Sequence, residues 1–313
     1  MTARLFLSIG EPMVELSRAG DGDADFWRMG FAGDVLNTLW CARASLPEAG
    51  WRTALLTRLG VDPFSARMRA FLDRNGFDTA YVGTDETRSV GLYAIDLSPT
   101  GERSFSYWRS ASAARGLADD AAALADAIAA ADLVYFSGIT LAILPPAGRE
   151  NLVDAARAAK ARGQAVVFDP NIRPALWENR ETMARWLREG IAAASIGLPS
   201  FDDDAELWGD ASPSDCLHRW QAAGCGEVAV KNGGGDIVVG MPGHVETIAV
   251  ERVRPVDTTG AGDAFNAAYL AARLAGIAPP EAVRAGHGLA RHVIGQRGAL
   301  IPMERLKELT LRG

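Results

Sequence analysis

A glycine-rich turn late in the chain carries the residues with the clearest chemistry. Residues 257–263 read DTTGAGD and lead directly into a run of strong helix formers. A Gly-Ala-Gly turn at the start of a helix leaves several backbone N–H groups unpaired, and the positive end of the helix dipole makes them a site for an anion. The carboxylate of Asp263 can take the proton of an attacking hydroxyl while this site holds a transferring phosphoryl group. The predicted catalytic residues are Gly260, Ala261, Gly262 and Asp263.

The same motif has a structural alternative, in which Asp263 only complements the helix dipole at a glycine-rich helix start. Asp257 and the two threonines before the glycines argue against that alternative. The sequence contains no Gly-x4-Gly-Lys-[Ser/Thr] and no complete Gly-x-Gly-x-x-Gly. A P-loop nucleotide hydrolase is therefore excluded, and a dinucleotide-dependent oxidoreductase becomes a distant alternative.

The composition is that of an ordinary soluble globular protein. The chain has 313 residues, 48% hydrophobic and 23% charged, which fits one large domain or two modest ones and excludes disorder. The net charge of −7 argues against a nucleic-acid surface. No apolar stretch approaches the roughly 20 residues that span a bilayer. Three scattered cysteines favour small buried thiols in a reducing compartment, so we expect a cytoplasmic protein without nucleic-acid or membrane partners.

Short apolar runs alternate with helical patterns along most of the chain. Such strand–helix units predict an α/β fold with a mostly parallel sheet and helices on both faces. Asp62-Pro63 marks one helix start, and Gly76 marks its end. Residues 89–109 break the pattern, because an apolar run, a turn at residues 98–101 and an alternating run predict a β-hairpin. With part of residues 11–31, this hairpin is predicted to form a small β appendage.

Ligands of open parallel sheets bind outside the carboxyl ends of the strands. A search for site residues therefore concerns the loops that follow five predicted strands or apolar runs. These loops follow Ile9, Phe168, Leu198, Val230 and Val256, and the last of them contains the glycine-rich turn.

The DTTGAGD motif resembles the signature of the ribokinase-like (PfkB) family of carbohydrate kinases. Residues 32–37, AGDVLN, resemble the family's N-terminal signature, and the order of elements agrees over essentially the whole chain. The resemblance implies a ribokinase-like three-layer α/β/α sandwich with a mostly parallel central sheet and a small β-sheet lid over the sugar. The chain would then be one kinase domain, residues 1–313, with a lid subdomain from about 11–31 and 88–112.

Within the family, the resemblance is closest to the 2-keto-3-deoxygluconate kinases. It implies ATP-dependent phosphorylation of the C6 hydroxyl of 2-keto-3-deoxygluconate, giving 2-keto-3-deoxy-6-phosphogluconate. A kinase for ribose, fructose or a related sugar acid, and a nonenzymatic nucleotide or sugar sensor on the same fold, are the alternatives. The segments that carry the resemblance are 33–38 (GDVLNT), 107–114 (YWRSASAA), 168–177 (FDPNIRPALW) and 199–201 (PSF).

The resemblance assigns sugar contacts to a helix start and to the lid hairpin. A glycine at a helix start permits close approach of the sugar, and nearby carboxylate and amide groups make oriented hydrogen bonds. Tyr107 and Arg109 are two residues apart and so face the same way, and a guanidinium there suits the carboxylate of a sugar acid. The alternative for Arg109 is an exposed charge on an edge strand. The substrate residues implied in these two regions are Gly33, Asp34, Asn37, Tyr93, Tyr107 and Arg109.

Further binding residues follow from the same resemblance. Arg173 can pair with the substrate carboxylate, with ATP phosphates or within a structural salt bridge. Residues 231–236, KNGGGD, match the family's nucleotide loop, although as a plain hairpin turn they would be unremarkable. The resemblance therefore adds Arg173 and Asp257 as substrate residues, and Asn171, Lys231, Gly233, Gly234 and Gly235 as ATP residues.

One segment departs from the family pattern. Where the family often carries Asn-x-x-Glu, linked to Mg2+ and phosphate, residues 200–203 read SFDD. Asp203 keeps an acid that is one methylene shorter, so we predict Mg2+ at Asp203, held through a water molecule. A helix cap formed by residues 202–204 is the alternative. The need for a monovalent cation is left open.

The lid would have exposed sheet edges unless they are paired. We therefore expect a homodimer through the lids, as the resemblance also implies, with a larger homo-oligomer left open. The expected small-molecule partners are a sugar acid and ATP.

Overall fold

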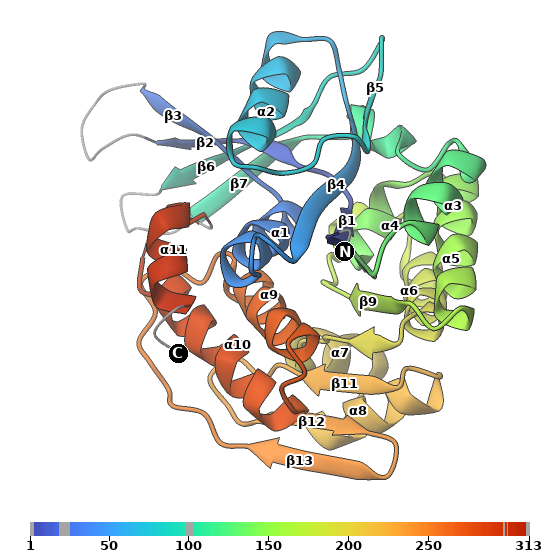
Figure 1. The fold of residues 1–313 in the computed structure, drawn as a ribbon, viewed down its shortest axis with the longest axis vertical. Coiled ribbons are helices and arrows are strands. Elements are labelled where there is room, and N and C mark those ends of the chain that lie inside the picture. The colour runs from blue at the N-terminus through green and yellow to red at the C-terminus, as the bar shows by residue number, and fades with distance from the viewer. Residues whose placement is uncertain (1–2, 19–25, 98–102, 297, 299, 311–313) are drawn as a thin grey trace.

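Two β-sheets of unequal size organise the chain (Figure 1). The computed structural model describes residues 3–18, 26–97, 103–296, 298 and 300–310. Within these ranges, a nine-stranded main sheet has the order β13-β12-β11-β10-β9-β8-β1-β4-β5, and a four-stranded second sheet has the order β3-β2-β6-β7. The strands of the main sheet are β1 (Arg4–Ile9), β4 (Trp51–Leu59), β5 (Val82–Thr84), β8 (Leu133–Ser137), β9 (Ala165–Asp169), β10 (Ile196–Gly197), β11 (Glu227–Val230), β12 (Ile237–Met241) and β13 (His244–Ile248).

The main sheet is parallel except at one edge. Crossover connections bring β1, β4, β5, β8, β9, β10 and β11 into parallel pairing. β12 and β13 follow β11 through short turns and therefore run antiparallel. The mostly parallel α/β architecture predicted from the strand–helix alternation is confirmed.

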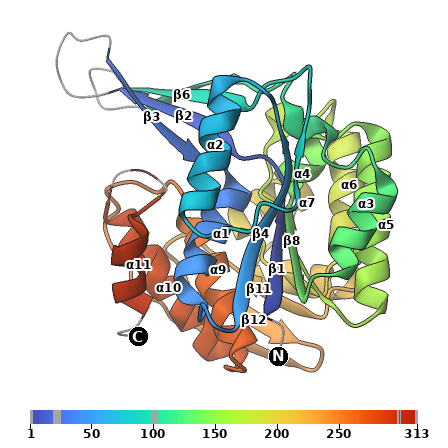
Figure 2. The same ribbon diagram turned by 45° about the horizontal axis from the view of Figure 1, so that its top comes forward.

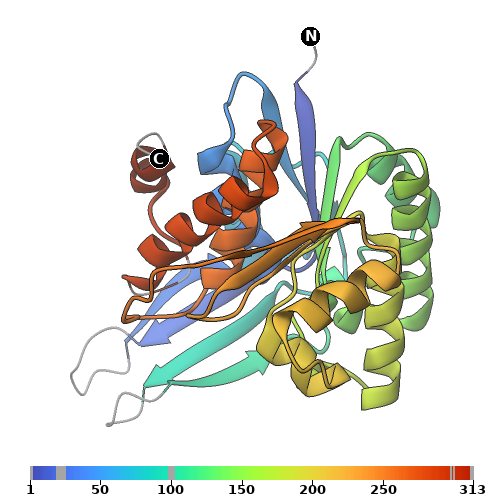
Figure 3. The ribbon, with the colours of Figure 1, turned by 90° about the horizontal axis from the view of Figure 1, so that it is seen from below.

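Helices cover both faces of the main sheet (Figure 3). Along β1, Phe6 packs into one core while Leu5 and Leu7 pack into the other, which is the alternation of a strand buried on both faces. The result is a three-layer α/β/α sandwich. The first face carries α1 (Asp34–Ser45), α2 (Pro63–Arg74), α9 (Ala261–Leu274), α10 (Pro279–Ile294) and α11 (Met303–Thr310), and the second carries α3 (Ala121–Ala129), α4 (Gly138–Ile143), α5 (Pro146–Ala161), α6 (Arg180–Ala193), α7 (Phe201–Trp208) and α8 (Pro213–Ala222).

Local signals account for the ends of α2. Asp62 caps the helix by accepting hydrogen bonds from the N–H groups of Phe64 and Ser65, 2.9 and 3.0 Å away. Pro63 is the first helical residue, where its missing N–H is not needed. Gly76, with φ of 73°, follows the end of the helix. The start and end predicted from these residues are confirmed.

A short helix, α11, follows α9 and α10 at the end of the described chain. α11 packs against α1, and its Leu306 is fully buried in the core. The indole N–H of Trp40 donates a hydrogen bond to the carbonyl of Ile301, just before α11, at 2.8 Å. The helix has eight residues, too few for its periodicity to stand out in the sequence. Among the described residues, no helix combines the length and the apolar character that crossing a bilayer requires.

The second sheet stands over one end of the main sheet (Figure 2). The predicted hairpin is present as the antiparallel pair β6–β7, while its turn at residues 98–101 lies outside the described residues. Phe31 of this sheet packs on Phe71 of α2, with ring centroids 5.0 Å apart, so α2 ties the second sheet to the main body. The four strands are β2 (Met13–Arg18), β3 (Trp27–Ala32), β6 (Gly91–Leu97) and β7 (Arg103–Trp108).

Two glycines of α10 allow a test of the packing that holds α9 in place. A Cβ on Gly286 would lie 2.9 Å from the carbonyl oxygen of Phe265 in α9, whereas a Cβ on Gly288 would meet nothing within 4 Å. Both Gly→Ala changes gain the same helix propensity, about 1 kcal/mol. Overpacking should therefore make Gly286→Ala less stable than Gly288→Ala by about 1–3 kcal/mol, measured as the free energy of unfolding in urea. Equal stabilities would contradict the close contact between α9 and α10.

Candidate functional site

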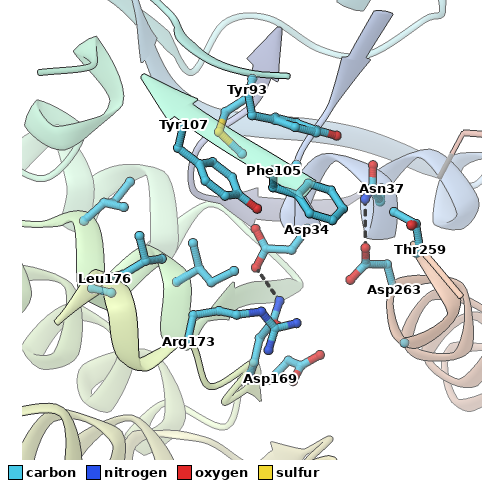
Figure 4. A pocket seen from close by; sticks show the side chains of 18 of the residues that line it. Asp34, Asn37, Tyr93, Phe105, Tyr107, Asp169, Arg173, Leu176, Thr259 and Asp263 are labelled. Carbon is cyan, nitrogen blue, oxygen red and sulfur yellow. Dashed lines mark hydrogen bonds between the residues drawn. The ribbon is translucent and has the colours of Figure 1, made fainter. Parts of the chain in front are cut away.

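A cavity of about 890 Å3 lies between the carboxyl ends of the main-sheet strands and the second sheet. Figure 4 shows Tyr93, Phe105 and Tyr107 on one side of this cavity, and Asp169 and Arg173 on the opposite side. Most of the residues singled out in the sequence line it. They are Gly33, Asp34, Asn37, Tyr93, Tyr107, Arg109, Asn171, Arg173, Asp203, Lys231, Gly260, Ala261, Gly262 and Asp263.

Two helix N-termini meet at this cavity. α1 begins after Gly33, with φ of 134°, and α9 begins after Gly260, with φ of 77°, and glycine adopts both values without strain. The side-chain amide of Asn37 in α1 donates a hydrogen bond to Asp263 Oδ2 in α9, at 2.8 Å (Figure 4). The unpaired N–H groups and dipoles of the two helix starts favour an anion between them.

Asp263 retains its proton to an unusually high pH. The residue is 9% exposed. Burial and the charges of Asp34 and Asp169 raise the pKa of its carboxyl to about 8, although the Asn37 hydrogen bond and Lys231 oppose the rise. A base whose pKa lies near the working pH transfers protons efficiently, and this carboxyl group is therefore suited to that role.

A buried hydrogen-bond network lies beside Asp263 on the side of the main sheet. Lys231, which follows β11, donates hydrogen bonds to Asp169 and to Asn266, each 3.0 Å away. The amide of Asn266 donates to Asp169 at 2.6 Å and to the Tyr135 hydroxyl at 3.0 Å. A Cβ on Gly262 would lie 3.6 Å from Lys231 Nζ. The network therefore holds a positive charge next to the glycine-rich turn.

The wall opposite the second sheet holds three further predicted residues. Asn171, at φ of 32°, donates a side-chain hydrogen bond to Asp34 at 3.1 Å, so it lies with a sugar-binding candidate although the sequence assigns it to ATP. Arg173 is half exposed, and its Nη1 lies 2.7 Å from the carbonyl oxygen of Ile172 and 3.5 Å from Asp203 Oδ2. This long ion pair leaves the guanidinium accessible to a ligand in the cavity.

The second sheet contributes an aromatic wall and an arginine. Tyr93, Phe105 and Tyr107 pack together, with ring centroids 5.8 to 6.3 Å apart. Arg109 also lines the cavity, but it is only 8% exposed and pairs with Glu11. The alternative of an exposed edge-strand charge is therefore wrong. Glu11 meets the charge of this guanidinium, so the charge by itself does not require an anionic substrate.

Asp257 does not face the cavity. The residue is 5% exposed, and its carboxylate accepts hydrogen bonds from the N–H groups of Thr259, at 3.0 Å, and Gly298, at 2.7 Å. An aspartate commonly accepts a bond from the N–H two residues on, because this mimics a backbone turn. Asp257 thus shapes the turn that exposes the following amides, which explains why it does not reach the position that the sequence implied.

The glycine-rich nucleotide loop also lies outside the cavity lining. Gly233, Gly234 and Gly235 belong to the connection from β11 to β12, and only Lys231 of this segment lines the cavity. The structure thus brings together in one cavity most of the residues predicted for the sugar, the metal and the phosphoryl group, whereas Asp257 and these three glycines do not line it.

Glu11, Asp169 and Asn266 are among the polar residues in or beside the cavity that were not predicted from the sequence. Glu11 follows β1 and Asp169 ends β9, so both lie at the carboxyl edge of the sheet, where site residues gather. Asn266 lies one helical turn after Asp263 and so shares its side of α9. Their positions at strand ends and on α9 could have indicated all three as site residues. Their hydrogen-bond partners could not be predicted, because these partners are distant in the chain.

This arrangement is suited to transferring a phosphoryl group to a hydroxyl group. The N–H of Ala261 is bonded to the carbonyl of Thr258 at 3.2 Å, so the amides of Gly260 and Gly262 are the ones that can hold the phosphoryl oxygens. Asp263 can take the proton of the hydroxyl. Asp34, Asn37 and Asn171 offer acceptors and donors that can orient a polyol in front of that acid. The aromatic wall can keep water away from the reacting groups.

Comparison with known proteins agrees with this chemistry. The family model described as pfkB family carbohydrate kinase matches residues 3–306. A 2-dehydro-3-deoxygluconokinase of Dickeya dadantii (strain 3937) is 39% identical, over 98% of this chain and 99% of its own. The protein of the same name from Escherichia coli (strain K12) is 38% identical, over 95% of this chain and 97% of its own.

A solved structure shares the arrangement of elements. It comes from E. coli, is provisionally assigned as a ribokinase II and is bound to ATP and Mg2+. It superposes with a TM-score of 0.83 at 20% identity, over the whole length of both chains. At this identity the likeness concerns the fold, and the predicted ribokinase-like architecture with its smaller sheet is confirmed.

The raised pKa of Asp263 sets an expected pH dependence of stability. Between about pH 4, where an unfolded aspartate ionises, and about pH 8, the folded state keeps a proton that the unfolded state has lost. This group therefore lowers the free energy of unfolding as the pH rises. Asp263→Asn removes the effect, so the stability of the variant relative to wild type should increase from pH 5 to pH 8, by at most about 1.4 kcal/mol per pH unit.

Urea unfolding of both proteins at several pH values measures this difference. The same change at Asp154, whose side chain is 76% exposed, is the control and should leave the pH dependence as it is in the wild type. Parallel stability curves for wild type and Asp263→Asn would show that the carboxyl group titrates normally.

Proposed function

The chain belongs to the pfkB family of carbohydrate kinases, and we propose that it phosphorylates 2-keto-3-deoxygluconate, also named 2-dehydro-3-deoxygluconate. The reaction transfers the γ-phosphoryl group of ATP to the C6 hydroxyl and gives 2-keto-3-deoxy-6-phosphogluconate and ADP. The observation that carries the proposal is the position of Asp263 beside the amides of residues 260–262, in a cavity large enough for a sugar acid. The names of the relatives support the choice of substrate.

Catalysis moves a phosphoryl group and a proton between positioned groups. The C6 oxygen forms a bond to the γ-phosphorus, while the bond from that phosphorus to the bridging oxygen breaks and its electron pair goes to ADP. The hydroxyl proton passes to Asp263, which must be ionised to accept it, so the rate is expected to rise with pH through about 8. The amides of Gly260 and Gly262 and the ammonium of Lys231 stabilise the charge on the phosphoryl oxygens.

Recognition of the sugar acid is assigned to the walls of the cavity. Arg109 offers its N–H groups that are not bonded to Glu11 to the substrate carboxylate. Arg173 lies across the cavity, half exposed, and can meet either that carboxylate or the ATP phosphates. The substrate hydroxyls are assigned to Asp34 and Asn37, with Tyr93 and Tyr107 covering the sugar from the second sheet.

ATP and its metal ion are assigned to the side of the cavity that carries Lys231 and Asp203. Burial raises the pKa of the Asp203 carboxyl, Arg173 lowers it, and the nearby charge of Asp169 raises it again. Crowded carboxylate oxygens fit a hard divalent cation, and we assign Mg2+ to Asp203 through a water molecule. Bound there, Mg2+ would neutralise phosphate charge. The glycines at 233–235 are proposed to lie along the nucleotide, and a monovalent cation is left open.

The organisation of the protein follows from this assignment. We propose one kinase domain, residues 1–313, in which a lid of about 11–31 and 88–112 closes over the sugar and keeps water from the phosphoryl group. Net charge and three free, buried cysteines support a cytoplasmic location. Phe26, Trp27 and Trp108, which are 73%, 41% and 61% exposed, lie at the edge strands of the second sheet and support a homodimer through the lids.

The nearest alternative is a kinase for ribose, fructose or a related sugar acid. The pairing of Arg109 with Glu11 favours this alternative, because a guanidinium whose charge is already met does not demand an anionic substrate. A nonenzymatic sensor would have no use for a base, so Asp263 argues against it. A dinucleotide oxidoreductase lacks its glycine fingerprint.

ADP release with a panel of neutral sugars and sugar acids tests the function. Wild-type protein with ATP and Mg2+ should show its highest kcat/KM with 2-keto-3-deoxygluconate. Asp263→Asn should lose about 10²–10⁴-fold in kcat, the range for loss of a general base, while Asp154→Asn should turn over normally. Near-normal turnover of Asp263→Asn would remove the base from the mechanism. A better neutral substrate would favour the alternative kinase, and no ADP release with any sugar would favour the sensor.

Light scattering after size exclusion tests the lid dimer. Wild-type protein should have the mass of a dimer or of a larger assembly built from dimers. A charge on the exposed face of the edge strand β7, introduced as Trp108→Glu, should reduce that mass by separating the lids. Ile277→Glu, at a position 44% exposed after α9, should keep the wild-type mass. A monomeric wild type would contradict the dimer.

A further inference from the structure

Glu11 is a buried acid that the proposed reaction does not use. It lies on the connection from β1 of the main sheet to β2 of the second sheet, and it is 2% exposed. Its Oε2 accepts a hydrogen bond from Nη2 of Arg109, which is 98 residues away in the chain. Burial raises the pKa of the Glu11 carboxyl, and the charge of Arg109 opposes the rise. The ion pair joins the end of a main-sheet strand to the end of a second-sheet strand.

Glu11 also lies close to other residues that connect the second sheet to the rest of the chain. A Cβ on Gly33, which links β3 to α1, would lie 2.5 Å from the carbonyl oxygen of Glu11. A Cβ on Gly91, at the start of β6, would overlap Oε1 of the same residue. Arg109 follows β7 and forms the third contact. Gly91 leaves space for the side chain of Glu11, and Gly33 leaves space for its backbone carbonyl.

We propose that Glu11 is a positioning residue whose carboxylate holds the guanidinium of Arg109 so that its remaining N–H groups face the carboxylate of the sugar acid. The inference rests on the proposed function, because it requires a substrate that carries a carboxylate. A guanidinium is a flat fork of five N–H donors, and Glu11 occupies only part of it. Arg109 Nε has no hydrogen-bond partner among the described residues, so the orientation of the fork depends on Glu11.

The pair also connects substrate binding to the position of the second sheet. Arg109 follows β7, while Glu11 follows β1, so a substrate carboxylate on Arg109 is linked through Glu11 to the main sheet. A guanidinium that is already fixed loses less freedom when it binds a second carboxylate. The expected result of freeing it is therefore weaker binding of the sugar acid, without an effect on ATP.

Initial-rate kinetics of Glu11→Gln test this role, because the change keeps the size of the side chain and removes its charge. The KM for 2-keto-3-deoxygluconate should rise about tenfold or more, while kcat and the KM for ATP stay within about twofold. Arg109→Gln should raise the same KM. In that background, adding Glu11→Gln should change the KM less than about twofold, because Glu11 acts through Arg109.

Glu227→Gln is the matched control. Glu227 is 7% exposed and pairs with Arg273 at 2.8 Å, so the same chemical change breaks a buried ion pair outside the cavity lining. It should reduce the free energy of unfolding and leave the KM for the sugar acid at the wild-type value. An unchanged KM in folded Glu11→Gln, or independent effects of the two changes at Glu11 and Arg109, would overturn the inference.

A second variant covers the case in which Glu11→Gln does not fold, which thermal unfolding reveals. Glu11→Asp keeps the charge but shortens the side chain by one methylene, which moves the guanidinium away from the substrate. It should therefore raise the KM for 2-keto-3-deoxygluconate. A wild-type value of that KM would overturn the inference. Absence of ADP release by wild type with 2-keto-3-deoxygluconate would instead overturn the proposed function, and the inference with it. The two failures are therefore distinguishable.

Discussion

The hydrogen bond between Asn37 and Asp263 is the contact on which the site depends. It joins α1 to α9 across 226 residues of sequence and fixes the acid at the place where both helices begin. Burying a carboxyl group is unfavourable unless other groups compensate for it. Burial between the two helices outweighs the Asn37 hydrogen bond and Lys231, which favour the ionised form, and the pKa of Asp263 is therefore raised to about 8. The position of the acid and its unusual basicity thus have one cause.

The charged groups around Asp263 also give the cavity two sides of different electrostatic character. Helix N-termini attract anions, while the carboxylates of Asp34, Asp169 and Asp263 repel them and attract hydroxyl donors. An anionic group is therefore favoured beside the amides of Gly260 and Gly262, and a hydroxyl group beside the acids. Lys231 lies between Asp169 and the glycine-rich turn and holds a positive charge on that boundary. The electrostatics of the cavity thus differ between the side of the glycine-rich turn and the side of the acids.

Features fixed by neighbouring residues were predictable from the sequence, and features fixed by distant partners were not. The cap of α2 and the β6–β7 hairpin depend on residues a few positions apart, and the pattern of residue types shows them. The pairs Glu11–Arg109 and Lys231–Asp169 span 98 and 62 residues, and nothing local marks them. Asp257 belongs to the most informative motif, yet its carboxylate accepts hydrogen bonds from backbone N–H groups. One short motif thus contains both the candidate base, Asp263, and a residue that stabilises the turn before it.

Arg109 shows why a charge in the sequence is not yet evidence of a charged ligand. Taken alone, a guanidinium on the lid indicates an anionic substrate, but the structure gives it a buried carboxylate partner. Charge alone therefore cannot distinguish a sugar acid from a neutral sugar in this cavity. Discrimination must come from N–H groups that a carboxylate satisfies and a neutral sugar leaves unpaired, and unpaired buried donors are unfavourable. In the proposed role of Glu11, specificity depends on how firmly the guanidinium is oriented, so the proposed determinant of substrate choice is the junction between the two sheets and not the cation by itself.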